Sequence, residues 1–148
     1  MKELTIDFYP FATQTIHPFN IHGFSRSETP GMMVEISYDG VTGYGEGALP
    51  PYMKGQTVDT ATDFLKKVDL TRFSNPFCLD EILGYVDVIG EGMSCPKCAV
   101  DIAMHDLVGK LLGRPLYDIW GYNKDNPPDI SFTIGMDSED VLRRKVKE

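Results

Sequence analysis

The chain has 148 residues, 42% of them hydrophobic, which suffices for one globular domain, or for one domain and part of another. A net charge of −8 argues against a nucleic-acid partner, and no apolar run approaches the roughly 20 residues of a membrane-spanning helix. The N-terminus lacks the apolar core of a secretion signal and the three cysteines indicate reduced thiols, so we expect a cytoplasmic protein with no membrane partner.

The first third of the chain predicts a three-stranded antiparallel meander. Its strands are rich in β-branched and aromatic residues and cover residues 4–15, 29–38 and 41–47. Asp39-Gly40 provides a tight turn between the second and third strands. Irregular connections are predicted at 18–28 and 49–55, and both hold aromatic and polar side chains that a core does not require.

Helical patterns follow the meander at 57–68, at 79–90 and from Ser94 onward. The third helix is the clearest, because Ser94 can cap its first turn and Gly113 with Pro115 ends it. Its predicted buried face consists of Val100, Ala103, Met104, Leu107 and Leu111.

The last residues predict one strand, at 130–136, and one helix, from Glu139 to the end. The apolar side of that helix is formed by Val141, Leu142 and Val146. Lys145 and Lys147 are expected on its solvated face. A strand followed by a helix is half of a βαβ unit, so we expect the chain to stop inside a larger α/β domain.

Two motifs and the strand after them resemble the start of an enolase-superfamily protein, of the muconate-lactonizing subgroup and, within it, of the dipeptide epimerases. They are YDGVTGYGEG at 38–47, CAVDIAMHDLVGKLLGRPLYDIWG at 98–121 and SFTIGM at 131–136. The resemblance implies an α+β fold, with an enolase-like N-terminal capping domain at 1–125, made of the meander and a helical bundle. Residues 126–148 would then be the first strand and helix of a truncated TIM (β/α)₈ barrel.

The resemblance also implies a Mg²⁺-dependent isomerase, which epimerises dipeptides by removing the proton next to a carboxylate through an enediolate. In such proteins the metal ligands and the general bases lie on later barrel strands. We therefore expect no catalytic residue and no metal ligand in this chain, and no activity of the chain alone. The implied partner is a small-molecule dipeptide, and we expect a homo-oligomer. A muconate or chloromuconate cycloisomerase, or an o-succinylbenzoate synthase-like member of the same superfamily, is the alternative.

The first connection, at 18–28, matches a mobile capping loop that closes over the substrate in the family. Its candidate substrate-binding residues are His22, Phe24 and Arg26. The guanidinium of Arg26 would suit a substrate carboxylate, because the two groups can pair through two hydrogen bonds. In Ala-Glu epimerases an arginine of this loop binds the glutamyl side of the dipeptide. The matching position here is Phe24, which leaves room for a hydrophobic dipeptide, and an ordinary surface loop is the open alternative.

Three further candidates lie outside that loop. Tyr52 and Met53, in the second connection, are candidates for an apolar pocket wall, with packing between the two domains as the alternative. Thr133 matches a threonine that bonds the substrate backbone in epimerases, and a structural strand threonine is the alternative.

Two other patterns suggest chemistry of a different kind. Cys95-Pro-Lys-Cys98 begins a helix, where a thiol pKa is lowered, but no βαβ unit leads into it, which favours structural thiols. Asp101 and His105 lie one helical turn apart, and they lack a third metal ligand nearby. The competing functional class is a non-enzymatic interaction module that docks a partner on the apolar helix face. A CxxC redox protein is the third possibility.

Overall fold

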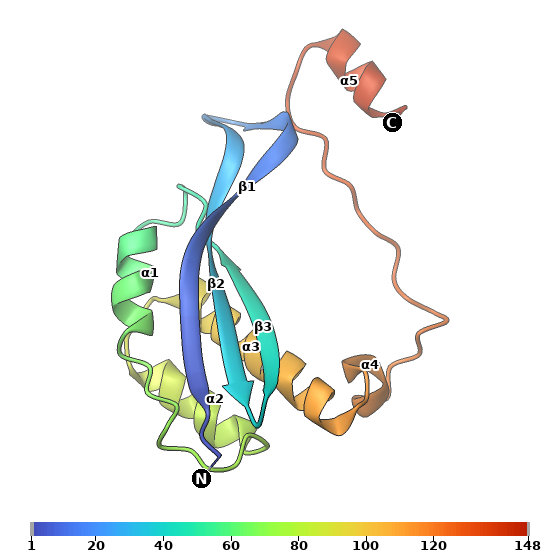
Figure 1. The fold of residues 1–148 in the computed structure, drawn as a ribbon. Coiled ribbons are helices and arrows are strands. Elements are labelled where there is room, and N and C mark those ends of the chain that lie inside the picture. Colours follow the sequence, from blue (N-terminus) through green and yellow to red (C-terminus); the bar gives the residue numbers. More distant parts are fainter. Residues whose placement is uncertain (1, 148) are drawn as a thin grey trace.

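A three-stranded antiparallel sheet with helices on one face forms the body of the computed structural model, which describes residues 2–147 (Figure 1). The strands are β1 (Thr5–Ile21), β2 (Phe24–Tyr38) and β3 (Val41–Ala48), in the order β1-β2-β3. The helices are α1 (Val58–Leu65), α2 (Leu79–Val88), α3 (Ser94–Leu112), α4 (Leu116–Ile119) and α5 (Glu139–Lys145). The predicted α+β architecture, a meander followed by helices, is confirmed.

The predicted loop at 18–28 is wrong, because these residues extend the β1–β2 hairpin. The strands pair from Thr5 with Ser37 to Ile21 with Phe24, and the chain reverses at Gly23, whose φ of 72° favours glycine. A register irregularity between Gln14 and Phe19 interrupts the ladder. Such bulges re-aim side chains, and here the outer part of the hairpin continues beyond the sheet body (Figure 1).

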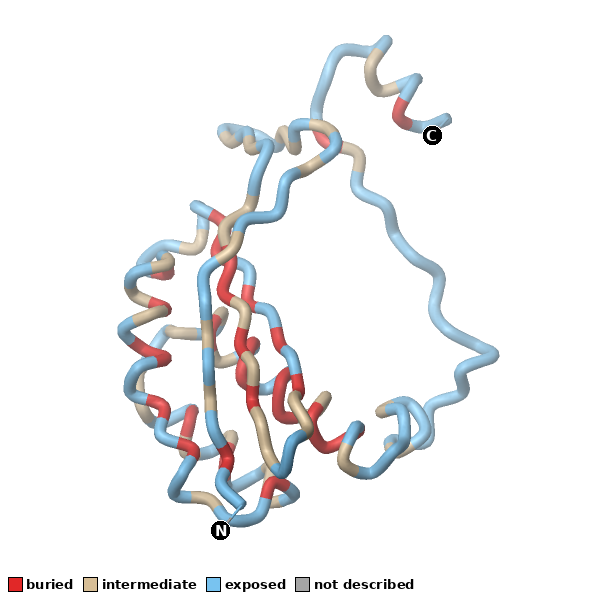
Figure 2. The backbone as a smooth tube through the Cα atoms, in the orientation of Figure 1, coloured by how far each residue is buried: buried red, intermediate tan, exposed pale blue. Residues whose placement is uncertain are grey.

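The core lies between β2 and α3, and buried residues run along both elements in Figure 2. Four of the five residues predicted for the buried face of α3 are fully buried, while Leu111 is partly buried. They pack against Met32, Val34 and Ile36 of β2. Glycines of β3 lie against the same helix so closely that a Cβ at Gly45 would overlap the carbonyl oxygen of Ala99. The helix backbone therefore rests directly on the strand.

Gln56, and not Ser94, provides the side-chain acceptor at the start of α3. The helix begins at Ser94 without a side-chain cap of its own. Instead the Gln56 Oε1 accepts a hydrogen bond from the Cys95 backbone N–H at 2.8 Å, and its Nε2 donates to Ser94 Oγ at 3.0 Å. This acceptor lies 39 residues away in the chain, so local capping rules could not identify it.

We expect Gln56→Leu to lower the free energy of unfolding by about 1–3 kcal/mol, because it leaves a helix N–H without its acceptor. Gln14→Leu is the matched control, since Gln14 is exposed and its substitution is expected to change stability by less than about 0.5 kcal/mol. Equilibrium urea unfolding measures both. Equal stability of the two variants would contradict the capping role of Gln56.

The predicted strand at 130–136 does not form. These residues are extended and mostly exposed, and among residues 2–147 no strand pairs with them (Figure 1). The side chains of Ile130 and Phe132 are 94% and 85% exposed. The strand pattern of this segment therefore has no neighbouring strand to complete it.

The prediction for Lys145 is also wrong. Its side chain is only 8% exposed and its Nζ lies 3.4 Å from Asp137 Oδ2, whereas Lys147 is exposed as expected. The backbone N–H of Ser138 and, to a smaller extent, Lys145 lower the pKa of the Asp137 carboxyl. Val146, predicted to be on the apolar side, is 70% exposed. The short helix thus folds its basic residue back onto the carboxylate that precedes it.

Among the described residues, no helix has the length and hydropathy needed to cross a bilayer.

Candidate functional site

Three aromatic side chains surround one guanidinium, and the four residues come from the outer part of the β1–β2 hairpin and from the turn after β3. We call Phe19, Phe24, Arg26 and Tyr52 the hairpin cluster. The Arg26 guanidinium carbon lies 5.2 Å from the ring centroid of Phe19 and 5.8 Å from that of Tyr52. The rings of Phe24 and Tyr52 meet edge to face, with their centroids 5.7 Å apart. Cation–π contacts with these two rings hold the guanidinium in place.

The backbone explains why these residues meet. Phe24 and Arg26 are two residues apart on β2 and share a face of the strand, and Phe19 pairs directly opposite Arg26. The turn that carries Tyr52 is tied to β2 by a hydrogen bond of 2.8 Å from Leu49 N to Pro30 O. Two connections that are far apart in the sequence therefore meet beside the sheet.

Arg26 is left with unused hydrogen-bond donors. Its Nε and Nη1 are buried and have no acceptor among the residues that the structure describes. Each buried donor without a partner costs about 1–3 kcal/mol, and a guanidinium keeps its charge at any ordinary pH. The cluster thus holds a cation whose buried Nε and Nη1 lack a protein acceptor, and a carboxylate that reached them could accept both hydrogen bonds.

The structure joins Phe24, Arg26 and Tyr52 of the six predicted residues, and it separates the others. His22 lies exposed at the hairpin turn, Met53 is half-buried beside Tyr52, and Thr133 is exposed on the extended C-terminal segment. No ring contact or side-chain hydrogen bond within the described part of the chain links these three to the cluster.

Phe19 is the cluster member that sequence reasoning missed. The predicted loop concealed its pairing with Arg26, which depends on the irregularity after Gln14. The alternation of Phe19, Ile21, Phe24 and Arg26 was the available signal.

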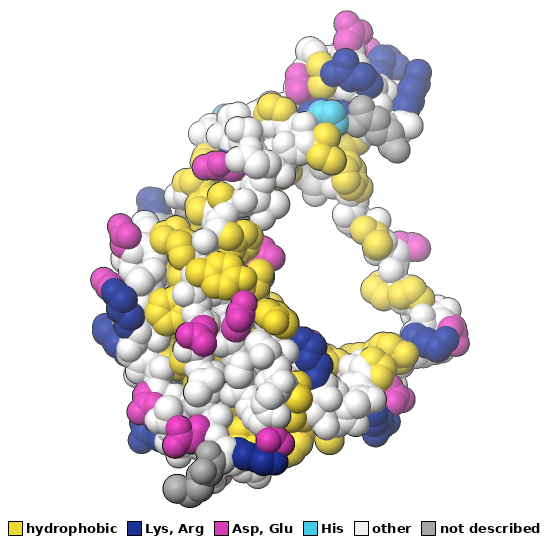
Figure 3. Space-filling view, in the orientation of Figure 1, with side chains coloured by type: hydrophobic (Ala, Val, Ile, Leu, Met, Phe, Trp, Pro, Cys, Tyr) yellow, Lys and Arg dark blue, Asp and Glu magenta, His cyan; other side chains and the backbone are white. Residues whose placement is uncertain are grey.

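Hydrophobic side chains gather over the sheet face toward the viewer in Figure 3, and an open gap separates this face from the C-terminal segment. The segment returns to the sheet body only near the end of the hairpin (Figure 1).

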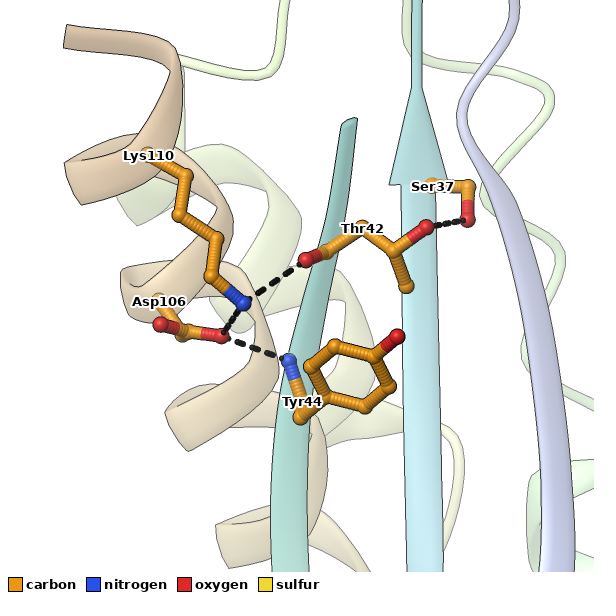
Figure 4. A network of polar contacts seen from close by, with 5 residues as sticks. All are labelled: Ser37, Thr42, Tyr44, Asp106 and Lys110. Carbon is orange, nitrogen blue, oxygen red and sulfur yellow. Dashed lines mark hydrogen bonds and ion pairs between the residues drawn. The ribbon is translucent and has the colours of Figure 1, made fainter. Parts of the chain in front are cut away.

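The Asp-Leu-Val-Gly-Lys part of the helix motif has a structural role at the free edge of β3 (Figure 4). Asp106 Oδ2 accepts hydrogen bonds from the Tyr44 backbone N–H at 2.8 Å and from Lys110 Nζ at 2.6 Å. Lys110 Nζ also donates to the Thr42 carbonyl at 2.9 Å and lies 4.5 Å from the Tyr44 ring centroid. Because β2 is the one strand that pairs with β3 among residues 2–147, these side chains satisfy backbone groups that the sheet leaves open.

No metal site is evident among residues 2–147, where no group of three or more His, Cys, Asp or Glu residues could hold an ion. His105 Nδ1 lies 2.7 Å from Asp101 Oδ1, and its ring meets Trp120 edge to face at 5.4 Å. The pair therefore links α3 to the residues after α4.

The structure argues against a redox role for Cys95. Burial raises the pKa of its thiol above the ordinary 9.0, which is opposite to the depressed pKa that a CxxC redox site requires.

Titration of the Cys95 thiol, in a variant carrying Cys78→Ser and Cys98→Ser, is expected to give a pKa above 9.0. Because the folded-state pKa is raised, the stability linked to this thiol is fully present below pH 9.0 and is lost as the pH rises through the folded pKa. Thiolate absorbance against pH measures this value. A pKa near 7 would restore the redox hypothesis.

Comparison with known proteins places the chain in a family. Residues 6–121 match the family described as mandelate racemase / muconate lactonizing enzyme, N-terminal domain. The L-Ala-D/L-Glu epimerase of Bacteroides thetaiotaomicron is 51% identical over 146 residues, which are 99% of this chain and 38% of that protein.

Solved structures of dipeptide epimerases share the fold. The enzyme from Methylococcus capsulatus, complexed with Mg and the dipeptide L-Arg-D-Lys, superposes with a TM-score of 0.87 at 25% identity, over 99% of this chain and 42% of that one. The enzyme from Enterococcus faecalis V583, complexed with Mg and L-Leu-L-Tyr, gives 0.85 at 27% identity, over 98% and 41%. The chain therefore spans about two fifths of the length of these relatives. They favour the dipeptide epimerases over the cycloisomerase and synthase alternatives.

Proposed function

This chain belongs to the mandelate racemase / muconate lactonizing enzyme family, and from that membership we propose that it is the capping part of a Mg²⁺-dependent dipeptide epimerase. The observation that carries the proposal is the 51% identity to an L-Ala-D/L-Glu epimerase across 99% of the chain. In this proposal residues 1–125 form the capping domain, and residues 126–148 supply the first strand and helix of a barrel domain.

The described residues do not fit a Mg²⁺ site, so the proposal assigns the metal ligands and the general bases to the part of the relatives that this chain does not span. When bound there, the metal stabilises the negative charge that develops once the proton next to the substrate carboxylate is removed. The residues of this chain contribute binding, orientation and exclusion of water.

Arg26 is proposed to bind the side-chain carboxylate of an acidic second residue in the dipeptide. Its unpartnered Nε and Nη1 support this role, as does its place beside Phe24, the position that matches the substrate-binding arginine of Ala-Glu epimerases. Both residues contact Tyr52, so a guanidinium two residues further along β2 reaches the same surface.

The other candidates complete the proposed substrate surface. Phe24 and Tyr52 would cover the apolar part of the dipeptide and exclude water, with Met53 and His22 at the rim. Thr133 would bond the dipeptide backbone, once its segment pairs with barrel strands.

We also propose a cytoplasmic, homo-oligomeric protein. Cys78, Cys95 and Cys98 are free thiols, which suits a reducing compartment. The exposed side chains of Ile130 and Phe132 are suited to burial against further protein. Analytical ultracentrifugation measures the oligomeric state.

A chimera tests the proposed function directly. This chain replaces the matching segment of the B. thetaiotaomicron epimerase, and NMR in D₂O follows exchange of the α-proton of the second residue of L-Ala-L-Glu. With Mg²⁺ the chimera is expected to exchange this proton within about tenfold of the parent rate, a loss of no more than about 1.4 kcal/mol in barrier height.

The chain alone is the control, and it is expected to show no exchange above background, since the described residues offer no metal site. A chimera that folds with native circular dichroism and gives no exchange would refute the proposed function. Exchange by the chain alone would refute the assignment of the general bases to the part of the relatives that this chain does not span.

A further inference from the structure

A backbone hydrogen bond attaches the end of the β1–β2 hairpin to the C-terminal segment within residues 2–147. The Met136 backbone N–H donates a hydrogen bond of 2.7 Å to the Asn20 carbonyl. Gly135 is buried at this place, whereas residues 121–133 are all exposed. Figure 2 shows the same change from exposed to buried where the segment reaches the hairpin.

Gly135 is required by this contact and not by its own backbone conformation. Its φ is not among the positive values that favour glycine. A Cβ at this position would lie 2.9 Å from the backbone N of Asn20 and 3.0 Å from its backbone O. Backbone atoms of a paired strand cannot move aside as a flexible side chain can, so any side chain here separates the two segments.

Asn20 is itself held firmly in the hairpin. Its Oδ1 accepts a hydrogen bond of 2.6 Å from Ser25 Oγ, and the two residues are direct partners across the strands. The next pair along the ladder is Phe19 with Arg26, which belongs to the hairpin cluster. The Asn20–Ser25 pair therefore lies directly beside the Phe19–Arg26 pair, so a shift of Asn20 is expected to shift this part of the hairpin cluster as well.

We infer that Asn20 and Gly135 form a clasp that positions the hairpin cluster relative to Thr133, two residues before Gly135. The clasp joins the two elements that carry the proposed substrate contacts, so both are presented to the dipeptide as one unit. Its role in substrate binding rests on the proposed function, whereas its existence as a contact does not. Asn20 and Gly135 are positioning residues, since they act through Arg26 and Thr133.

Amide hydrogen exchange on the full chain, measured by NMR, tests the contact. Gly135→Ala is expected to reduce the protection of the Met136 amide at least about tenfold, because the amide loses its hydrogen bond to Asn20. The core amide of Val34 is expected to keep its protection. Gly84→Ala is the matched control, because a Cβ at Gly84 meets nothing within 4 Å. It is expected to leave the Met136 amide unchanged.

A second variant removes the donor itself. Met136→Pro has no backbone N–H at this position and is expected to loosen the hairpin end as Gly135→Ala does, seen as faster exchange of the Phe24 amide. A Met136 amide without protection in the unmodified chain, or unchanged by Gly135→Ala, would overturn the clasp.

The chimera tests the role in binding. Gly135→Ala is expected to raise the KM for L-Ala-L-Glu about tenfold with a much smaller change in kcat, because the substrate contacts lose their common position while the bases do not move. Unchanged KM in a chimera that has lost Met136 protection would overturn the positioning role. If the chimera without the variant is inactive, the proposed function fails, and the exchange experiment still decides the contact.

Discussion

Gly45→Ala is expected to lower the free energy of unfolding by about 3 kcal/mol, the largest effect on stability that we predict for one added methyl group. A Cβ at Gly45 would overlap the Ala99 carbonyl oxygen and approach the Ala103 backbone N to 2.6 Å. Both are backbone atoms of α3, so the helix must shift away from the sheet and give up packing against the β2 core.

Gly84→Ala again provides the control, because it adds the same methyl group in open space within α2. There alanine is expected to raise the free energy of unfolding by about 0.5–1 kcal/mol, through the better helix propensity of alanine. Equilibrium urea unfolding followed by circular dichroism measures both variants. A Gly45→Ala protein as stable as the unmodified chain would show that α3 does not rest on β3 as described.

Arg26→Met in the chimera is expected to reduce kcat/KM for L-Ala-L-Glu about 100-fold, which corresponds to about 2.7 kcal/mol of lost charge-assisted hydrogen bonding. Methionine keeps most of the side-chain volume between Phe19 and Tyr52 but removes the charge and the donors. The loss for L-Ala-L-Leu is expected to be much smaller, since that dipeptide has no side-chain carboxylate.

Two further variants separate charge from stacking. Arg26→Lys keeps the charge but not the planar fork, so it is expected to restore part of the activity toward L-Ala-L-Glu. Arg72→Met is the matched control, because Arg72 also lies over an aromatic ring, with its guanidinium carbon 4.6 Å from the Tyr85 centroid, outside the hairpin cluster. It is expected to leave kcat/KM unchanged. Equal losses for both dipeptides in Arg26→Met would contradict a carboxylate-binding role.

Local patterns were sufficient to predict the body of the fold. The periodicity of α3 identified its buried face, because helical spacing and end signals are encoded within one segment. The glycines of β3 are evident in the sequence, but only the structure shows that α3 lies directly against them.

Contacts between distant segments could not be predicted in the same way. An irregular connection was predicted at 18–28, yet the β1–β2 pairing resumes at Phe19 and continues to Ile21 with Phe24. The start of α3 is stabilised by Gln56, which belongs to another part of the chain. In each case the partner is chosen by the tertiary fold, which a local pattern does not contain.

The candidate site shows the same division. The resemblance identified Phe24, Arg26 and Tyr52, and the structure brings them together. The resemblance did not identify Phe19 or Asn20, whose roles depend on the strand register after Gln14. The strand pattern at 130–136 is present in the sequence, but the described residues include no neighbouring strand with which it pairs.

The central claim, that the hairpin cluster is a substrate-covering surface, is tested most directly by a crystal structure of the chimera with Mg²⁺ and L-Ala-L-Glu. The account predicts that the glutamyl carboxylate lies within hydrogen-bond distance of the Arg26 guanidinium, with Phe24 and Tyr52 covering the dipeptide. A bound dipeptide whose side chain points away from Arg26, with the cluster facing bulk solvent, would contradict it.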